Sequence, residues 1–146
     1  RMEGFCRKME EQSVDISHRI FSGPYTINAG YDIVMRMLNL PTFPDAIFVH
    51  NNVQVYGIIH ALMNLRKKIP EDVSIVSFDF MDDTKLIQPQ ITSVLQPVSQ
   101  LAAQAVQLVI EPEQAKNHPN IILNHTIYMG ASLCNKPPRH WAHFHM

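Results

Sequence analysis

The sequence VSIVSFD at residues 73–79 is a short, mostly apolar run that ends in a carboxylate. Runs of this kind, rich in β-branched residues, are typical of strands buried within a parallel sheet. A second such run, DAIFV at residues 45–49, lies upstream, and residues 52–65 between the two have the length and composition of a helix. Strand, helix and strand in this order predict a right-handed βαβ unit, and therefore an α/β fold.

Apolar periodicity and turn signals extend this pattern in both directions along the chain. They predict helices at residues 4–12, 28–39 and 98–110, and extended runs at residues 16–21, 91–95, 121–123 and 125–132. Thr26 is a candidate N-cap for the second helix. We therefore expect a Rossmann-like parallel sheet flanked by helices.

Composition excludes several classes of function. The 146 residues are 46% apolar, which suffices for one domain with a core. The 12 basic and 13 acidic residues are dispersed, so no footprint for nucleic acid is present, and no apolar run is long enough to cross a membrane. Cys6 and Cys134 lie far apart without metal-ligand spacing, which favours a reducing compartment such as the cytoplasm. Because Arg1 directly opens a helical pattern, we expect the chain to be a piece of a longer protein.

Three polar or aromatic residues follow the ends of predicted strands. Asn51 follows the strand at residues 45–49, Asp79 follows the strand at residues 73–78, and Tyr25 lies in the turn after the run that ends at Phe21. Ligands of open parallel sheets lie beyond the carboxyl ends of the strands. An amide, a carboxylate and an aromatic face suit a polyhydroxylated ligand. The alternative is that each residue is an ordinary cap or turn residue.

The acidic and histidine-rich stretches suggest two other kinds of chemistry. Asp79 together with Asp82 and Asp83 would suit Mg²⁺ or a phosphoacceptor site. The chain has no glycine-rich phosphate loop and no nucleophile elbow, so we expect neither an enzyme nor a cofactor. The histidines at residues 140, 143 and 145 lack the spacing of a helical metal pair, and we expect a disordered tail there and no metal site.

Four segments in order carry a family resemblance. They are RMEGF at residues 1–5, PDAIFVHN at 44–51, IPEDVSIVSFD at 69–79 and ITSVLQPV at 91–98. In sequence and separation they resemble the lactose-repressor/galactose-repressor family of bacterial transcription regulators, over residues 1 to about 132. Departures from the family pattern are Asn51-Asn52 for Asn-Asp, Ser77-Phe78-Asp79-Phe80 for Gly-Phe-Asp-Asp, and Gly130-Ala131-Ser132 for Arg-x-Ser.

The resemblance implies a type I periplasmic-binding-protein-like effector domain of two lobes, joined to a helix-turn-helix headpiece. It implies that residues 1–95 form the second lobe, residues 96–124 belong to the first lobe, and residues 125–134 are the closing strand of the second lobe. Residues 135–146, rich in Pro, His and aromatic residues without periodicity, are expected to be a disordered tail.

The same resemblance implies roles for individual residues. Arg1, Asn51 and Asp79 correspond to family residues that hold sugar or nucleoside effectors. Tyr25 corresponds to an aromatic that stacks on the effector, and Gln96 lies near the hinge crossings. The effector then binds between the lobes, and the departures at Asn52 and Phe80 leave open which effector fits.

The resemblance implies a headpiece and most of a first lobe that these residues do not include, and it therefore also implies partners. Operator DNA would be bound by a headpiece absent from this chain. The helix at residues 98–110 would lack a cover for seven apolar side chains, so we expect it to be covered by another copy, exchanged with one, or mobile. A homodimer is expected through residues 52–65. The alternative function is an extracytoplasmic sugar-binding protein of a transporter, and the upstream sequence would distinguish the two.

Overall fold

The computed structural model describes residues 1–80, 86–111, 113 and 120–135. It contains one four-stranded sheet with the strand order β1-β2-β3-β4. The strands are β1 (Ala46–Val49), β2 (Ser74–Phe78), β3 (Thr92–Leu95) and β4 (Thr126–Tyr128). The first three are parallel, and β4 runs antiparallel to β3. The predicted α/β class with a mostly parallel sheet is therefore confirmed.

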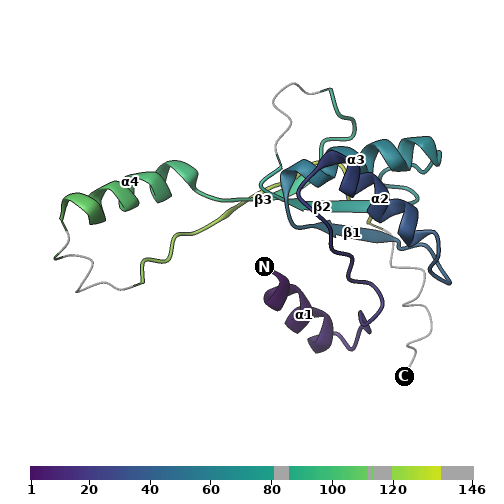
Figure 1. Cartoon of the computed structure of the whole chain (residues 1–146), viewed down its shortest axis with the longest axis horizontal. Helices are drawn as coiled ribbons and strands as arrows, with labels where there is room; N and C mark the ends of the chain where they lie inside the picture. Colours follow the sequence, from purple (N-terminus) through teal and green to yellow (C-terminus); the bar gives the residue numbers. More distant parts are fainter. Residues whose placement is uncertain (81–85, 112, 114–119, 136–146) are drawn as a thin grey trace.

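Two helices, α2 (Ile27–Met37) and α3 (Asn52–Asn64), lie together over one face of this sheet (Figure 1). Thr26 caps α2 as predicted, because its Oγ1 accepts a hydrogen bond from the Ala29 N–H at 3.1 Å. The core lies between these helices and the sheet. Its fully buried apolar side chains are Val34, Val55, Ala61, Leu62, Val73 and Ile75.

Glycine allows α2 and α3 to lie unusually close. A Cβ atom on Gly57 would clash with the carbonyl oxygen of Ile27, and a Cβ on Gly30 would clash with the carbonyl oxygen of Gln54. The two helices therefore meet backbone to backbone at this crossing, where any larger residue would force them apart.

The face of the sheet opposite α2 and α3 is less buried than we expected from the apolar sequences of its strands. Ile47 and Val49 are buried, whereas Phe48 between them is only half-buried, and the same alternation continues along β2. The helix α1 (Met2–Glu11) supplies part of the cover on this side, where Phe5 stacks on Phe48 with ring centroids 5.7 Å apart. Phe5, Cys6 and Met9 form its half-buried side.

The extended run predicted at residues 16–21 does not form a strand. The Asp15 carboxylate accepts the Ser17 N–H at 2.9 Å, and the Arg19 N–H donates to the Ile16 carbonyl at 2.9 Å. These local bonds turn the chain at this point, and β1 is an edge strand of the sheet.

The helix α4 (Val98–Ile110) has the predicted bounds but stands away from the sheet on an extended arm (Figure 1). None of its residues is buried, and Val106 and Val109 are 58% and 82% exposed. The extended run predicted at residues 121–123 lies on the return path and forms no strand. Among the described residues, no strand pairs with this segment.

The segment after the arm closes the sheet. Only residues 126–128 of the predicted run at 125–132 form a strand, and the rest is held by the buried Ser132. The Ser132 Oγ accepts the Thr92 N–H at 2.9 Å and donates to the Ile75 carbonyl at 2.6 Å. Ser132 thus joins the C-terminal segment to β2 and β3.

Candidate functional site

The three parallel strands end at one edge of the sheet, and a polar residue follows each end. Asn51 follows β1 after His50, Asp79 follows β2 directly, and Gln96 follows β3 directly. Because the strands are parallel and in register, these residues share the carboxyl edge.

Arg1 reaches across this edge from the start of α1. Its Nη1 donates to the His50 carbonyl oxygen at 3.0 Å, and its Nη2 lies 3.4 Å from Oδ2 of Asp79. The guanidinium carbon lies 3.7 Å from the centre of the Phe78 ring, a cation–π contact. The side chain is still 39% exposed, so part of the guanidinium fork faces solvent.

Asp79 is the carboxylate at the centre of the group. Its Oδ1 accepts the backbone N–H of Gln96 at 2.9 Å, and its Oδ2 accepts the Gln96 side-chain amide as well as Arg1. Its backbone has a φ of +57°, a left-handed conformation that is uncommon outside glycine and costs energy. This strained turn aims the carboxylate along the edge, toward Gln96 and Arg1.

Asn51 is the N-cap of α3. Its Oδ1 accepts the Gln54 N–H at 2.9 Å, and its Nδ2 donates to Oε1 of Gln54 at 2.8 Å. Asn51 is therefore a cap residue, as the alternative interpretation of the sequence predicted. A capping role is compatible with an additional contact to a ligand. One hydrogen of the Asn51 amide has no acceptor among the described residues.

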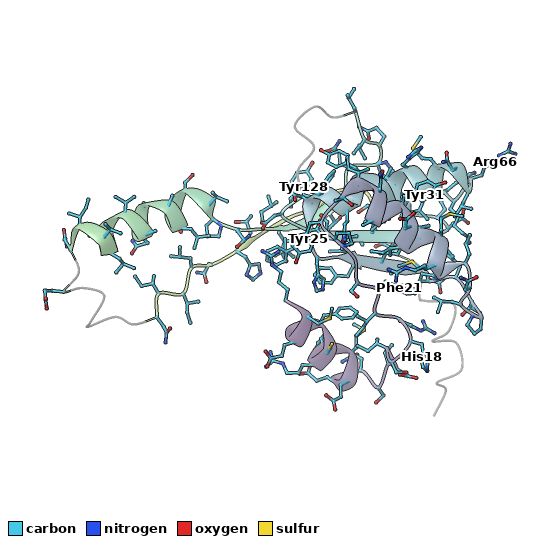
Figure 2. The ribbon with its side chains drawn as sticks, viewed as in Figure 1. His18, Phe21, Tyr25, Tyr31, Arg66 and Tyr128 are labelled. Carbon is cyan, nitrogen blue, oxygen red and sulfur yellow. The ribbon has the colours of Figure 1, made fainter. Side chains whose placement is uncertain are left out.

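Tyr25 lies in the turn before α2 and is 75% exposed. Figure 2 shows it at the end of the sheet from which the α4 arm leaves. The turn is attached to α3, because Nε2 of Gln54 donates to the Pro24 carbonyl at 2.9 Å and lies 3.3 Å from the Gly23 carbonyl. Asp79 contacts both Arg1 and Gln96. Gln54 links Asn51 to the carbonyl groups of the turn that carries Tyr25.

Sequence reasoning overlooked three contributors to this edge. Phe78 supports the Arg1 guanidinium, Gln54 supports Asn51 and the Tyr25 turn, and His50 supplies a carbonyl to Arg1. Burial lowers the pKa of His50 below its ordinary value, and the positive charges of Arg1 lower it further. The spacing Asn51-x-x-Gln54, that of a capping box, was the one available signal for Gln54.

The departure at Phe80 has a structural explanation. Phe80 is 2% exposed and packs edge-on against Tyr56 of α3, with ring centroids 5.1 Å apart. Its side chain therefore belongs to the core and not to the carboxyl edge. Asp79 contributes a carboxylate to the edge without a second one from its neighbour.

The described part of the chain shows no cluster of three His, Cys, Asp or Glu side chains that would hold a metal ion. Asp82, Asp83 and the histidines at 140, 143 and 145 lie outside the described residues. None of the helices in the described ranges has the length and hydropathy to span a membrane.

Comparison with known proteins adds independent information. Residues 1–134 match the family model described as a periplasmic binding protein-like domain. The HTH-type transcriptional repressor CytR of Escherichia coli strain K12 is 28% identical over 118 residues, which are 80% of this chain and 35% of that protein. The HTH-type transcriptional repressor PurR of Pasteurella multocida is 29% identical over 136 residues, 87% of this chain and 41% of that protein.

The fold is also that of a solved regulator. The crystal structure of a LacI family transcriptional regulator from Enterococcus faecalis V583 with bound ribose is similar with a TM-score of 0.72 and 25% identity, over 93% of this chain and 49% of that chain. The present chain thus spans less than half of each of these three proteins. The resemblance expected from the four sequence segments is confirmed.

Proposed function

Because the chain belongs to the periplasmic binding protein-like domain family, we propose that it is the effector-sensing and dimerising part of a bacterial DNA-binding transcriptional regulator. Its ligand is a small sugar or nucleoside, and it performs no catalysis. Operator DNA is bound by a headpiece outside this chain, and the protein acts in the cytoplasm. The observation that carries the proposal is that Asp79 contacts both Arg1 and Gln96 at one edge of the sheet.

The chemistry of the edge suits a ligand with several hydroxyl groups. Arg1 offers N–H donors that its two described contacts leave unused, and Asn51 offers one more. Asp79 is an acceptor for ligand hydroxyls where they displace the Gln96 amide. The exposed ring of Tyr25 offers a flat face for the CH side of a sugar ring or for a base.

The proposed mechanism is a change in the equilibrium between lobe arrangements. A ligand that bridges this edge and the first lobe favours one closure angle. The change in angle moves the two headpieces of a dimer relative to paired half-sites, so that DNA affinity changes through geometry.

The transporter alternative has the same fold but less support. The two curated relatives described above are transcriptional repressors. The coding sequence upstream of Arg1 provides a direct test, since a helix-turn-helix there supports the regulator and a signal peptide supports the transport protein.

Ligand binding is tested by a thermal-shift screen of ribose, sucrose and the common nucleosides, followed by calorimetric titration of any hit. The screen uses the chain and the longer protein that encloses it, because half of the proposed cleft lies outside the chain. We expect a hit whose binding is lost in Asp79→Ala and kept in Asp32→Ala, a matched variant on the exposed side of α2. A hit unaffected by Asp79→Ala would overturn the site.

A further inference from the structure

We propose that Gln54 is a positioning residue of the candidate effector site, which orients the Asn51 amide and holds the turn that carries Tyr25. The inference rests on the proposed function for its biological meaning, but it stands on contacts within the chain. Gln54 is the third residue of α3 and is 7% exposed.

Every polar group of the Gln54 side chain has a partner. Its Oε1 accepts from Nδ2 of Asn51 at 2.8 Å, and its Nε2 donates to the Pro24 carbonyl at 2.9 Å, with the Gly23 carbonyl at 3.3 Å. A buried amide with satisfied partners has one favoured orientation, because reversing it would place like groups against each other. Gln54 is therefore a fixed bridge between the start of α3 and the turn before α2.

The first consequence concerns Asn51. Since its Oδ1 accepts the Gln54 N–H and its Nδ2 faces Oε1 of Gln54, the amide of Asn51 cannot reverse without losing both bonds. Its remaining Nδ2 hydrogen then has a set direction. In the proposed site Asn51 acts as a donor toward a ligand oxygen, and Gln54 determines that role.

The second consequence concerns Tyr25. The Pro24 carbonyl accepts from Gln54 and also from the Thr26 N–H at 2.9 Å, so the residue before Tyr25 is bonded both to α3 and to the residue after Tyr25. The helices cross closely here, because the Gln54 carbonyl lies against Gly30. An exposed ring on a fixed turn loses less conformational freedom when a ligand binds than a ring on a loose turn.

The test compares Gln54→Met with Gln100→Met by hydrogen exchange without ligand. Methionine has a similar length but cannot form these hydrogen bonds. Gln100 is also the third residue of its helix, but it is exposed. We expect exchange about tenfold faster in peptides covering residues 22–30 of Gln54→Met, with residues 72–79 unchanged and Gln100→Met equal to wild type. Unchanged exchange at residues 22–30, or uniformly faster exchange in every core peptide, would overturn the inference.

Nuclear magnetic resonance supplies a measurement that does not need the variant to fold. In the wild-type chain we expect nuclear Overhauser contacts from the Gln54 side-chain amide to Pro24 and to the Asn51 amide. Their absence would also overturn the inference.

The contribution of Gln54 to ligand binding is tested with ribose as the probe. Affinity should fall at least about threefold in Gln54→Met and stay unchanged in Gln100→Met, and equal affinities would overturn the positioning role. If the wild-type protein bound neither ribose nor any nucleoside, the proposed function would fail, while the exchange experiment would still decide whether Gln54 holds the turn.

Discussion

Nη2 of Arg1 lies 3.4 Å from Oδ2 of Asp79, although 78 positions separate the two residues in the sequence. The pair joins the start of α1 to the end of β2, and the same guanidinium stacks on Phe78. Arginine can make these contacts at once because its fork is planar and carries five N–H donors.

Arg1→Lys tests that geometry while keeping the charge. A lysine ammonium cannot stack on Phe78 and bond both His50 and Asp79, so we expect ligand affinity to fall about tenfold. The midpoint of urea unfolding should change little, since a partly exposed ion pair contributes about 0.2–1 kcal/mol. Calorimetric titration and urea denaturation measure the two quantities, with Arg7→Lys on exposed α1 as control. Equal affinities in both variants would contradict a direct role for Arg1.

Substitutions at Asn51 separate its cap from its proposed ligand contact. Asn51→Asp keeps an N-cap oxygen for α3, whereas Asn51→Ala removes it and should cost about 1 kcal/mol of unfolding free energy. Both variants lose the Nδ2 donor, so both should weaken ligand binding. Affinity that fell only in the alanine variant would show that Asn51 is a cap and nothing more. Urea unfolding and titration of the two variants provide the comparison.

Gly57→Ala tests the close crossing of α2 and α3. A methyl group there would clash with the Ile27 carbonyl, and the helices would have to separate, at a cost of about 1–3 kcal/mol. Gly4→Ala is the matched control, because no heavy atom lies within 4 Å of its added Cβ. That variant should gain about 0.5–1 kcal/mol from helix propensity. Thermal unfolding of both would reveal opposite shifts of Tm, and equal shifts would refute the close packing.

The lowered pKa of His50 predicts a dependence of stability on pH. Its ordinary pKa is 6.5 and the folded value is lower, so in the interval between the two the unfolded chain binds more protons. The folded state therefore loses stability as the pH falls through the range below 6.5. In His50→Gln this part of the loss should disappear. Urea midpoints at several pH values test it, and parallel curves for the two proteins would contradict the shift.

The apolar side chains of α4 predict self-association. Burying a valine or leucine side chain stabilises by about 1.5–3 kcal/mol, so the exposed face should be covered by a second copy, exchanged with it, or mobile. Light scattering should show self-association, and the double variant Val106→Glu with Val109→Glu should weaken it, whereas a dimer held through residues 52–65 alone would be unchanged. Gln107→Glu, an exposed neighbour on α4, is the control. A wild-type monomer with α4 strongly protected from hydrogen exchange would contradict the prediction.

Local sequence signals predicted most of the elements. The bounds of α4 and the caps at Thr26 and Asn51 depend on neighbours a few positions away, and they agree with the structure. The strand predicted at residues 16–21 was wrong: the segment forms local turn bonds at Asp15 and Ile16, which apolar composition alone does not predict. The prediction that the strands are buried on both faces was wrong for another reason, because the burial of a sheet face depends on elements far away in the chain.

The candidate site was partly predictable for the same reason. The position of Asp79 after a strand is a local feature of the sequence, but its contacts with Arg1 and Gln96 join three distant segments. Gln54 and Ser132 act through hydrogen bonds to groups 30 and 57 positions away, and no local pattern predicts those partners, although the capping-box spacing marks Gln54 as a neighbour of Asn51.

Gln96 is both the partner of the Asp79 carboxylate and the last residue before the chain enters the arm that carries α4. In the proposed site, a ligand hydroxyl that replaced the Gln96 side-chain amide on Asp79 would remove one of the two bonds between Gln96 and Asp79 and so loosen the start of the arm. By thermodynamic linkage the converse would also hold. A contact that fixes the start of the arm at Gln96 would change ligand affinity by the same factor by which the ligand changes that contact. The Asp79 carboxylate would then couple ligand binding at the carboxyl edge of the sheet to the orientation of α4, which lies outside the proposed site.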